Sequence, residues 1–242
     1  MSLDILYLKE GVLNESIVST ELGLKGIPNI SETINLFRDI EILNYTGGKI
    51  HIPYVTTSKG VELIREAKKR NLDITASVSI AHITFSEKDI PDFNTNFKII
   101  PPIRSKSDCN SLKEGLIDGT IDYLTSMHEP YDIDHKKVVF DDASPGTIGL
   151  EPMFGLMCNQ FTLEKTIDIL TRGKIIFEID DHSIDIGSKA NLALFNPDKN
   201  YEFSEKHILS SSNNCAFLGN KLKGVVYGSV NGDKFTLNKL WT

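Results

Sequence analysis

Cysteine is scarce in this sequence of 242 residues. The three cysteines, Cys109, Cys158 and Cys215, lie far apart, are odd in number and form no C-x-x-C pair. This pattern excludes a disulfide framework, and it argues against a cysteine-rich zinc site or a thiol redox motif. It predicts a protein of a reducing compartment, and we expect a cytoplasmic location.

Long apolar stretches are also missing. No run of the sequence approaches the ~20 apolar residues that a helix needs to span a bilayer. The first residues, Met1 to Asp4, lack the basic region and the apolar run that are typical of a signal peptide. We therefore expect neither membrane contact nor secretion.

Positive charge is in the minority. Lys plus Arg number 26 against 33 for Asp plus Glu, which gives a formal net charge of -7. A chain of this charge has no general attraction for nucleic acid or anionic membranes. Its longest basic run, Lys68-Lys69-Arg70, is interpreted as the solvated end of a helix. We expect no nucleic-acid partner.

What remains is the composition of a globular protein, with 40% hydrophobic and 24% charged residues. This balance excludes a disordered chain and a collagen-like rod. The sequence contains no G-x-S-x-G elbow, P-loop, H-E-x-x-H motif or dinucleotide glycine fingerprint. The chemistry of those classes is therefore not indicated.

Apolar periodicity predicts helices that alternate with short strands. In the first helix Ile34, Phe37 and Ile40 recur every three residues, Ser31 is expected to cap the start, and Gly47-Gly48 to end it. The expected helices are 31–43, 58–70, 107–118 (capped by Ser107 and Asp108) and 162–170, and the expected strands are 49–55, 73–78, 97–100 and 121–125. This alternation predicts an α/β protein with a parallel sheet, open or closed into a barrel.

The sequence pattern changes after about residue 183. Strand-like residues 191–195 precede an expected turn at 196–198, and residues 210–214 are expected to form a loop. Residues 223–230 lead into Asn231-Gly232, a strong hairpin signal, and a return strand at 235–237. The tail is therefore predicted to be a small antiparallel β region.

Short motifs recur in one order along nearly the whole chain. They are Gly23–Asn29, Thr46–His51, Val61–Lys68, Pro101–Arg104, Glu114–Asp122, Ile148–Glu151, Ile186–Leu192, Phe217–Gly219 and Leu222–Gly224. Each motif is weak alone, but their order and spacing together resemble the dihydroorotase family of cyclic amidohydrolases. The resemblance covers only the C-terminal part of such a protein, because the family's early His-x-His motif lies upstream of any residue here.

The resemblance implies part of a TIM-type β/α barrel over residues 1–183 and a small region of the amidohydrolase β-sandwich over 184–242. It implies a hydrolase of pyrimidine biosynthesis that opens the cyclic amide of dihydroorotate or closes carbamoyl aspartate. In that family zinc is held by imidazoles and carboxylates at the C-terminal ends of barrel strands, where it activates water and polarises the amide.

Two metal-ligand positions of the family lack histidine here. One falls within Met1-Ser2-Leu3-Asp4, and another falls at Tyr54, although the nearby His51 is retained. A neutral phenol is a poor metal ligand. The asparagine that touches substrate in the family is replaced by Ile100, whose side chain offers no hydrogen bond.

The loop that supplies the family's base is also altered. Met127 stands in place of the metal-binding and basic aspartate, His128 is kept, and Tyr131 replaces a substrate-binding histidine. A thioether is soft and has no transferable proton, so it replaces neither a carboxylate ligand nor a general base. We therefore expect no catalytic residue, no bound metal and no cofactor, and we interpret the site as degenerate.

The retained polar residues have milder interpretations. His51 and His82, the latter at a position that the family keeps, are expected to be hydrogen-bonded structural histidines rather than ligands. The run His128–His135 holds two imidazoles and three carboxylates, so a new metal site is the alternative to a solvated loop. The loop Gly146–Gly149 could offer amides to an anion, but the entry to a helix is the favoured interpretation.

The leading hypothesis is a dihydroorotase-like pseudoenzyme that acts through protein contacts. Some members of the family without metal residues are structural partners of aspartate carbamoyltransferase, and the resemblance extends to them. We also expect a homo-oligomer. The alternative is an active zinc-dependent dihydroorotase completed by an upstream segment or another subunit, and a decayed gene product is a third interpretation.

Overall fold

The computed structural model describes residues 3–8, 10–179 and 184–241. The chain divides into two compact units, each described by itself. Unit 1 comprises Met1–Leu150 and Ser210–Ala216, and unit 2 comprises Glu151–Leu209 and Phe217–Thr242. The predicted domain boundary after residue 183 falls beside residues outside the described part, and it stays a prediction.

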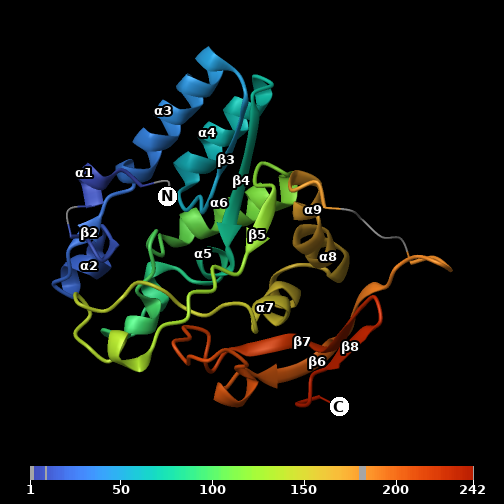
Figure 1. The fold of residues 1–242 in the computed structure, drawn as a ribbon. Helices are drawn as coiled ribbons and strands as arrows, with labels where there is room; N and C mark the ends of the chain where they lie inside the picture. Colours follow the sequence, from blue (N-terminus) through green and yellow to red (C-terminus); the bar gives the residue numbers. More distant parts are fainter. Residues whose placement is uncertain (1–2, 9, 180–183, 242) are drawn as a thin grey trace. The chain divides into compact units, whose positions relative to one another are not determined.

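Unit 1 is a mixed α/β structure (Figure 1). Its elements in chain order are α1 (Ile5–Leu8), β1 (Leu13–Asn14), α2 (Ile17–Glu21), β2 (Gly26–Ile27), α3 (Ile30–Thr46), β3 (Lys49–Ile52), α4 (Ser58–Lys69), β4 (Asp73–Ser79), α5 (Ile80–Thr84), α6 (Lys106–Asp118) and β5 (Tyr123–Thr125), with 3-10 turns at Glu87–Asp89, Thr95–Phe97 and Ile133–His135. The alternation predicted for residues 31–125 is thus confirmed in outline, with one strand missing.

The main sheet of unit 1 is parallel, as predicted. Its strand order is β3-β4-β5, with Ile52 opposite Ala76 and Val78 opposite Leu124. Helix α3 packs on β3, and α4 packs on β4 and α6. The side chains buried in this layer include Val61, Ile64 and Ala67 of α4 and Ile74, Ala76 and Val78 of β4. Each larger aliphatic residue contributes roughly 1.5–3 kcal/mol by leaving water.

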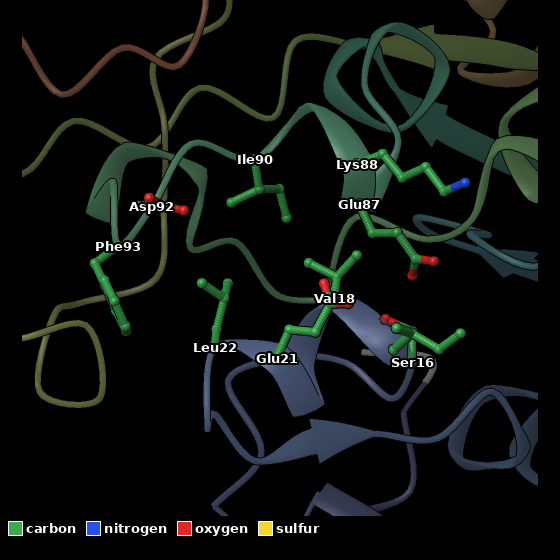
Figure 2. A pocket seen from close by; sticks show the side chains of 10 residues that line it. Ser16, Val18, Glu21, Leu22, Glu87, Lys88, Ile90, Asp92 and Phe93 are labelled. Atoms are coloured by element: carbon green, nitrogen blue, oxygen red, sulfur yellow. The ribbon is translucent and has the colours of Figure 1, made fainter.

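A second, short parallel pair joins β1 and β2, with Leu13 opposite Gly26. Helix α2 lies between these two strands in the chain. It forms one wall of a groove whose other wall is the segment after α5 (Figure 2). The groove lies within unit 1, and its lining residues belong to residues 16–22 and 87–93.

The described part of unit 2 contains three helices and an antiparallel sheet, which confirms the predicted β tail. The helices are α7 (Met153–Gln160), α8 (Leu163–Thr171) and α9 (Gly173–Ile176), and the sheet consists of β6 (Asn191–Glu202), β7 (Lys221–Asn231) and β8 (Lys234–Leu237), with a 3-10 turn at Glu205–His207. Helix α7 packs on β7, where a Cβ added at Gly155 would lie 2.9 Å from Leu222 Cβ. Asn231-Gly232 begins the predicted hairpin between β7 and β8.

Four local predictions are wrong. Residues 97–100 do not form a strand, because the Phe97 and Lys98 amides donate to Asn94 and Thr95 within a local turn. Residues 196–198 do not end a strand: β6 continues through Pro197 with a shift in register. The predicted caps at Ser31 and Ser107 are also displaced, since Ser31 Oγ donates to the Pro28 carbonyl and Ser105 caps α6.

No helix in the described part of the chain is both long enough and apolar enough to cross a membrane.

Gly119 ends α6 in the left-handed region, at φ 81° and ψ 9°. Apart from the two chain neighbours of Gly119, no described residue has an atom within 4 Å of a Cβ added there. We expect Gly119→Ala to lower the free energy of unfolding by about 1 kcal/mol through backbone strain alone, measured by urea denaturation. Gly119→Asn should lower it less, since asparagine tolerates this conformation; an equal loss would contradict a backbone origin.

Candidate functional site

The candidate site positions follow the parallel strands of unit 1. Tyr54 follows β3, His82 lies in α5 directly after β4, and Met127 follows β5. The carboxyl ends of parallel strands meet at one edge of a sheet, which is where α/β proteins bind ligands. The structure therefore places the three sequence-predicted positions after neighbouring strands of one sheet.

The backbone at Tyr54 and Met127 is strained. Their φ angles are 54° and 46°, in the left-handed region that bulky side chains rarely adopt. Each such residue costs about 1–3 kcal/mol, and such strain concentrates at functional sites. Met127 is also buried, with 4% of its surface exposed. The strained geometry thus holds a phenol and a thioether at the two positions that the sequence resemblance assigns to metal ligands.

His82 is fully engaged as a structural residue. It is 2% exposed; its Nδ1 lies 2.7 Å from Ser79 Oγ and its Nε2 lies 2.9 Å from the Pro101 carbonyl oxygen. A carbonyl only accepts, so Nε2–H donates to Pro101 and Nδ1 accepts from the Ser79 hydroxyl. Burial lowers the pKa of His82 to about 4. With both nitrogens bonded within the protein, neither can hold a metal.

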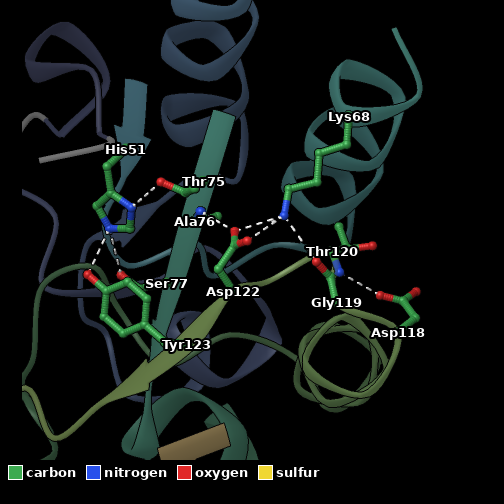
Figure 3. Close-up of polar contacts among 10 residues, drawn as sticks. All are labelled: His51, Lys68, Thr75, Ala76, Ser77, Asp118, Gly119, Thr120, Asp122 and Tyr123. Atoms are coloured by element: carbon green, nitrogen blue, oxygen red, sulfur yellow. Dashed lines mark hydrogen bonds and ion pairs between the residues drawn. The ribbon is translucent and has the colours of Figure 1, made fainter. Parts of the chain in front are cut away.

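His51 of β3 belongs to a polar cluster with side chains of the neighbouring strands β4 and β5 (Figure 3). Its Nδ1 lies 2.9 Å from Thr75 Oγ1, and its Nε2 lies 3.3 Å from Ser77 Oγ and 3.1 Å from the Tyr123 hydroxyl. The His51 and Tyr123 rings are stacked, with centroids 5.3 Å apart. Strand pairing places His51 beside Thr75 and Ser77 beside Tyr123, so these side chains share one face of the sheet.

The electrostatics of this cluster favour neutral groups. Burial lowers the pKa of His51, against the opposing charge of Asp122, and burial raises the pKa of Tyr123. Asp122 itself is bound by Lys68 Nζ at 2.8 Å and by the Ala76 amide at 2.7 Å (Figure 3). Burial therefore favours the neutral forms of His51 and Tyr123, while the Asp122 carboxylate acts on His51 in the opposite sense.

The loop after β5 is anchored by Asn214. Its Oδ1 accepts from the Tyr131 amide at 3.0 Å, and its Nδ2 donates to the Glu129 carbonyl at 2.8 Å and to the Gly146 carbonyl at 3.2 Å. His128 Nδ1 accepts from the Leu150 amide at 3.3 Å. These bonds fix the backbone of the loop, and the Tyr131 ring lies against His135 with centroids 5.9 Å apart.

Two buried lysines also hold this loop. Lys98 Nζ donates to the Phe140 and Asp141 carbonyls at 2.9 and 2.7 Å, and Lys136 Nζ donates to the Ser144 carbonyl at 2.8 Å. Burial lowers the pKa of Lys136 to about 8. The half-buried Ile100 adds an aliphatic side chain to the segment before Pro101.

The donor set does not fit zinc. Among residues 3–8, 10–179 and 184–241, no group of three or more His, Cys, Asp or Glu side chains is placed to hold a metal ion. The run His128–His135 does not form such a group either, and Met1 and Ser2 lie outside the described residues. Zinc requires several imidazole, thiolate or carboxylate ligands around one centre, and Tyr54, His82 and Met127 do not supply them.

A buried polar network in unit 1 was not anticipated from the sequence. Glu32 is completely buried and accepts from the Thr56 and Thr57 amides at 3.0 Å each. Arg104, also buried, donates from Nη1 to Asn14 Oδ1 and to the Ile27 carbonyl at 2.7 Å each. One signal was available: Arg104 closes the apolar stretch 99–103, where a charge has to be paired.

The comparisons with known proteins point to one family by sequence. The chain is 37% identical over 239 residues to a dihydroorotase from Caldanaerobacter subterraneus subsp. tengcongensis, covering 95% of this chain and 55% of the relative. It is 36% identical over 222 residues to a dihydroorotase from Carboxydothermus hydrogenoformans, covering 88% and 52%. The chain thus spans about half the length of the curated relatives it matches. No protein-family model matches it.

Solved structures show the same fold. The L-hydantoinase (dihydropyrimidinase) from Arthrobacter aurescens matches with a TM-score of 0.79 at 20% identity, covering 95% of this chain and 56% of that one. The inactive dihydroorotase-like domain of the Chaetomium thermophilum CAD-like multifunctional protein matches with a TM-score of 0.61 at 21% identity, covering 83% and 55%. Over most of its length the chain is therefore similar in sequence to about half of each of these dihydroorotases, and it shares the fold of the hydantoinase and of the inactive dihydroorotase-like domain.

Proposed function

We propose that this chain is a non-catalytic dihydroorotase-family protein of pyrimidine biosynthesis that acts through protein contacts, with aspartate carbamoyltransferase as the partner. The observation that carries the proposal is the burial of Met127, the residue that the sequence resemblance places at the position of the family's base. A thioether neither binds zinc as a carboxylate does nor removes a proton. Zinc is therefore not assigned to this chain as a cofactor. The proposal also places the chain in the cytoplasm.

The neighbouring side chains support the same proposal. Tyr54 presents a phenol where the family has a metal histidine, and His82 uses both ring nitrogens within the protein. Several groups must act together in metal-assisted hydrolysis, so the losses reinforce each other. A domain of the same fold from Chaetomium thermophilum is named inactive and dihydroorotase-like, which gives a precedent for a retained scaffold.

The proposal extends to the architecture. The sheet β3-β4-β5 is part of a TIM-type β/α barrel, and the sheet β6-β7-β8 is part of the amidohydrolase β-sandwich. Within the described residues β3 and β5 each pair on one side only, with β4. Open edges of a parallel sheet invite pairing with another chain or segment, which supports self-association into a homo-oligomer.

The alternative is an active zinc-dependent dihydroorotase completed by an upstream segment or another subunit. It is favoured by the relatives, which are named dihydroorotases and are almost twice as long. A further segment would add ligands, but Tyr54 and Met127 would still stand at their positions.

Purified full chain, loaded with zinc and dialysed, tests the proposal. We expect no dihydroorotate hydrolysis above background and no stoichiometric zinc by elemental analysis. The Caldanaerobacter relative, treated in the same way, is the positive control for both measurements. Copurification with the aspartate carbamoyltransferase of the same organism should yield a complex. Stoichiometric zinc together with turnover would establish the alternative, and absence of a complex would refute the assigned partner.

A further inference from the structure

An open groove of about 1020 Å³ lies in unit 1, between α2 and the segment after α5 (Figure 2). Its lining includes none of the candidate catalytic positions. The two walls are tied together, since Asn14 at the end of β1 donates to the Glu87 carboxylate and accepts from Arg104. The Glu87 amide also donates to the Arg104 carbonyl at 2.9 Å. A groove braced in this way is formed before any ligand arrives, which lowers the entropic loss on binding.

Apolar side chains line much of the groove. They come from both walls: Ile17, Val18 and Leu22 from the α2 side, and Ile90 and Phe93 from the other. Ile17 is 76% exposed and Phe93 is 52% exposed. Figure 2 shows Leu22, Ile90 and Phe93 near one another across the opening. An apolar ligand surface laid here would remove the exposed side chains of Ile17 and Phe93 from water and would also touch Ile90, which is 9% exposed.

The charge of the groove is negative. Glu21 and Asp92 supply two carboxylates against the ammonium of Lys88. The Glu87 carboxylate also lines the groove, but it accepts from Asn14 and offsets the charge of the buried Arg104. Glu21 and Asp92 are exposed, and the whole chain carries a formal net charge of -7. Such a surface attracts cationic partners and repels nucleic acid, anionic lipid and a second copy of this acidic chain.

We propose that this groove binds a basic amphipathic peptide segment of a partner protein. The segment lays apolar side chains on Leu22, Ile90 and Phe93 and places lysine or arginine opposite Glu21 and Asp92. Recognition of an amphipathic helix in a groove has this combination of anchors and flanking charges. A small organic cation alone would leave the apolar lining uncovered. The groove does not depend on the chemistry of the candidate site, so the proposal stands whether or not the chain is catalytic.

Fluorescence anisotropy with a labelled synthetic peptide tests this site. The peptide contains only leucine and lysine, with leucines at the i, i+3, i+4 and i+7 spacing of a helix face, and a matched peptide has glutamate in place of lysine. We expect the basic peptide to bind the full chain, the acidic one not to bind, and the affinity to fall with salt.

Two pairs of charge reversals locate the binding. Glu21→Lys/Asp92→Lys should weaken the basic peptide about tenfold, because attraction becomes repulsion at two contacts. Glu114→Lys/Asp134→Lys changes the net charge equally at exposed positions outside the groove lining and should change the affinity less than about twofold. Phe93→Ala should weaken binding about fivefold through lost apolar contact. Circular dichroism verifies that each variant folds.

Several results would overturn the proposal. These are equal binding of the acidic peptide, equal weakening by both pairs of reversals, and full displacement of the peptide by free lysine amide at concentrations comparable to the peptide's own. Self-association of the chain that Glu21→Lys/Asp92→Lys abolishes would assign the groove to a second copy and would also refute the proposed occupant.

Discussion

Glu32→Gln is expected to lower the free energy of unfolding by about 3 kcal/mol. The Glu32 carboxylate is completely buried near the start of α3 and accepts from the amides and hydroxyls of Thr56 and Thr57. A carboxamide has one accepting oxygen and an NH₂ that donates. The variant therefore places a donor against donors in a dry site, which loses hydrogen bonds and adds repulsion.

The second reason for this large effect is Arg104. Its guanidinium is buried, Nη2 has no hydrogen-bond partner within the described residues, and Glu32, Asp108 and Glu87 are the charges that offset its desolvation. Removing one partner of a buried charge network leaves the remaining charge uncompensated. Loss of the Glu32 charge therefore also leaves the buried charge of Arg104 less well compensated.

Urea denaturation at neutral pH, followed by circular dichroism, measures the effect. The matched control is Glu114→Gln, which neutralises an exposed carboxylate of α6 and should change stability by less than about 0.5 kcal/mol. A loss at Glu32→Gln no larger than the control would mean that the network is not formed in the folded protein. The companion variant Arg104→Met should show a loss that is not additive with Glu32→Gln.

The helices and paired strands of unit 1 were accessible from the sequence because local signals agreed with the tertiary fold. The predicted helix 31–43 is contained in α3, where Leu36, Ile40 and Leu43 are buried. Phe37, which the three-residue period placed on the apolar stripe, is instead 58% exposed. Gly47, at φ 71°, ends it as expected. The strand at Asp73–Ser79 carries buried residues almost throughout, as a parallel strand covered by helices should.

The wrong secondary-structure predictions occur where the backbone does not form the hydrogen bonds that the local sequence pattern predicts. The sequence pattern at 97–100 predicts a strand, yet the Phe97 and Lys98 amides close a local turn. The Lys98 side chain turns inward and donates to the Phe140 carbonyl in the loop after β5. Pro197 predicted a turn, but a bulged strand tolerates a residue that cannot donate to the ladder. Neither outcome is encoded in a short window of sequence, because both depend on distant partners.

The candidate site was likewise predictable only in part from the sequence. The order of the motifs is enough to identify Tyr54 and Met127 as site positions. Their left-handed backbone and the burial of Met127 are determined by the three-dimensional fold. The structural interpretation of His82 depends on Ser79 and on Pro101, which is 19 residues away. The Glu32–Arg104 network links positions over 70 residues apart in sequence, so local pattern could not reveal it.

His82 should make the protein sensitive to acid over a defined range. Burial lowers its pKa in the folded state to about 4, whereas an unfolded chain has the ordinary value of about 6.5. As the pH falls from 6.5 to 4, the unfolded chain binds a proton that the folded protein does not, so stability is present above pH 6.5 and is lost below it. The shift corresponds to about 3 kcal/mol.

Other groups titrate over the same pH range. The difference in free energy of unfolding between wild type and His82→Gln therefore isolates the contribution of His82. Near neutral pH the variant should be less stable, because it disturbs the bonds to Ser79 and Pro101. Its deficit should shrink by about 3 kcal/mol as the pH falls from 6.5 to 4, since glutamine takes up no proton. His135→Gln, which removes an exposed imidazole, should run parallel to wild type. A constant deficit at His82→Gln across this range would show that the imidazole is not held neutral in a dry site, and it would reopen His82 as a candidate metal ligand.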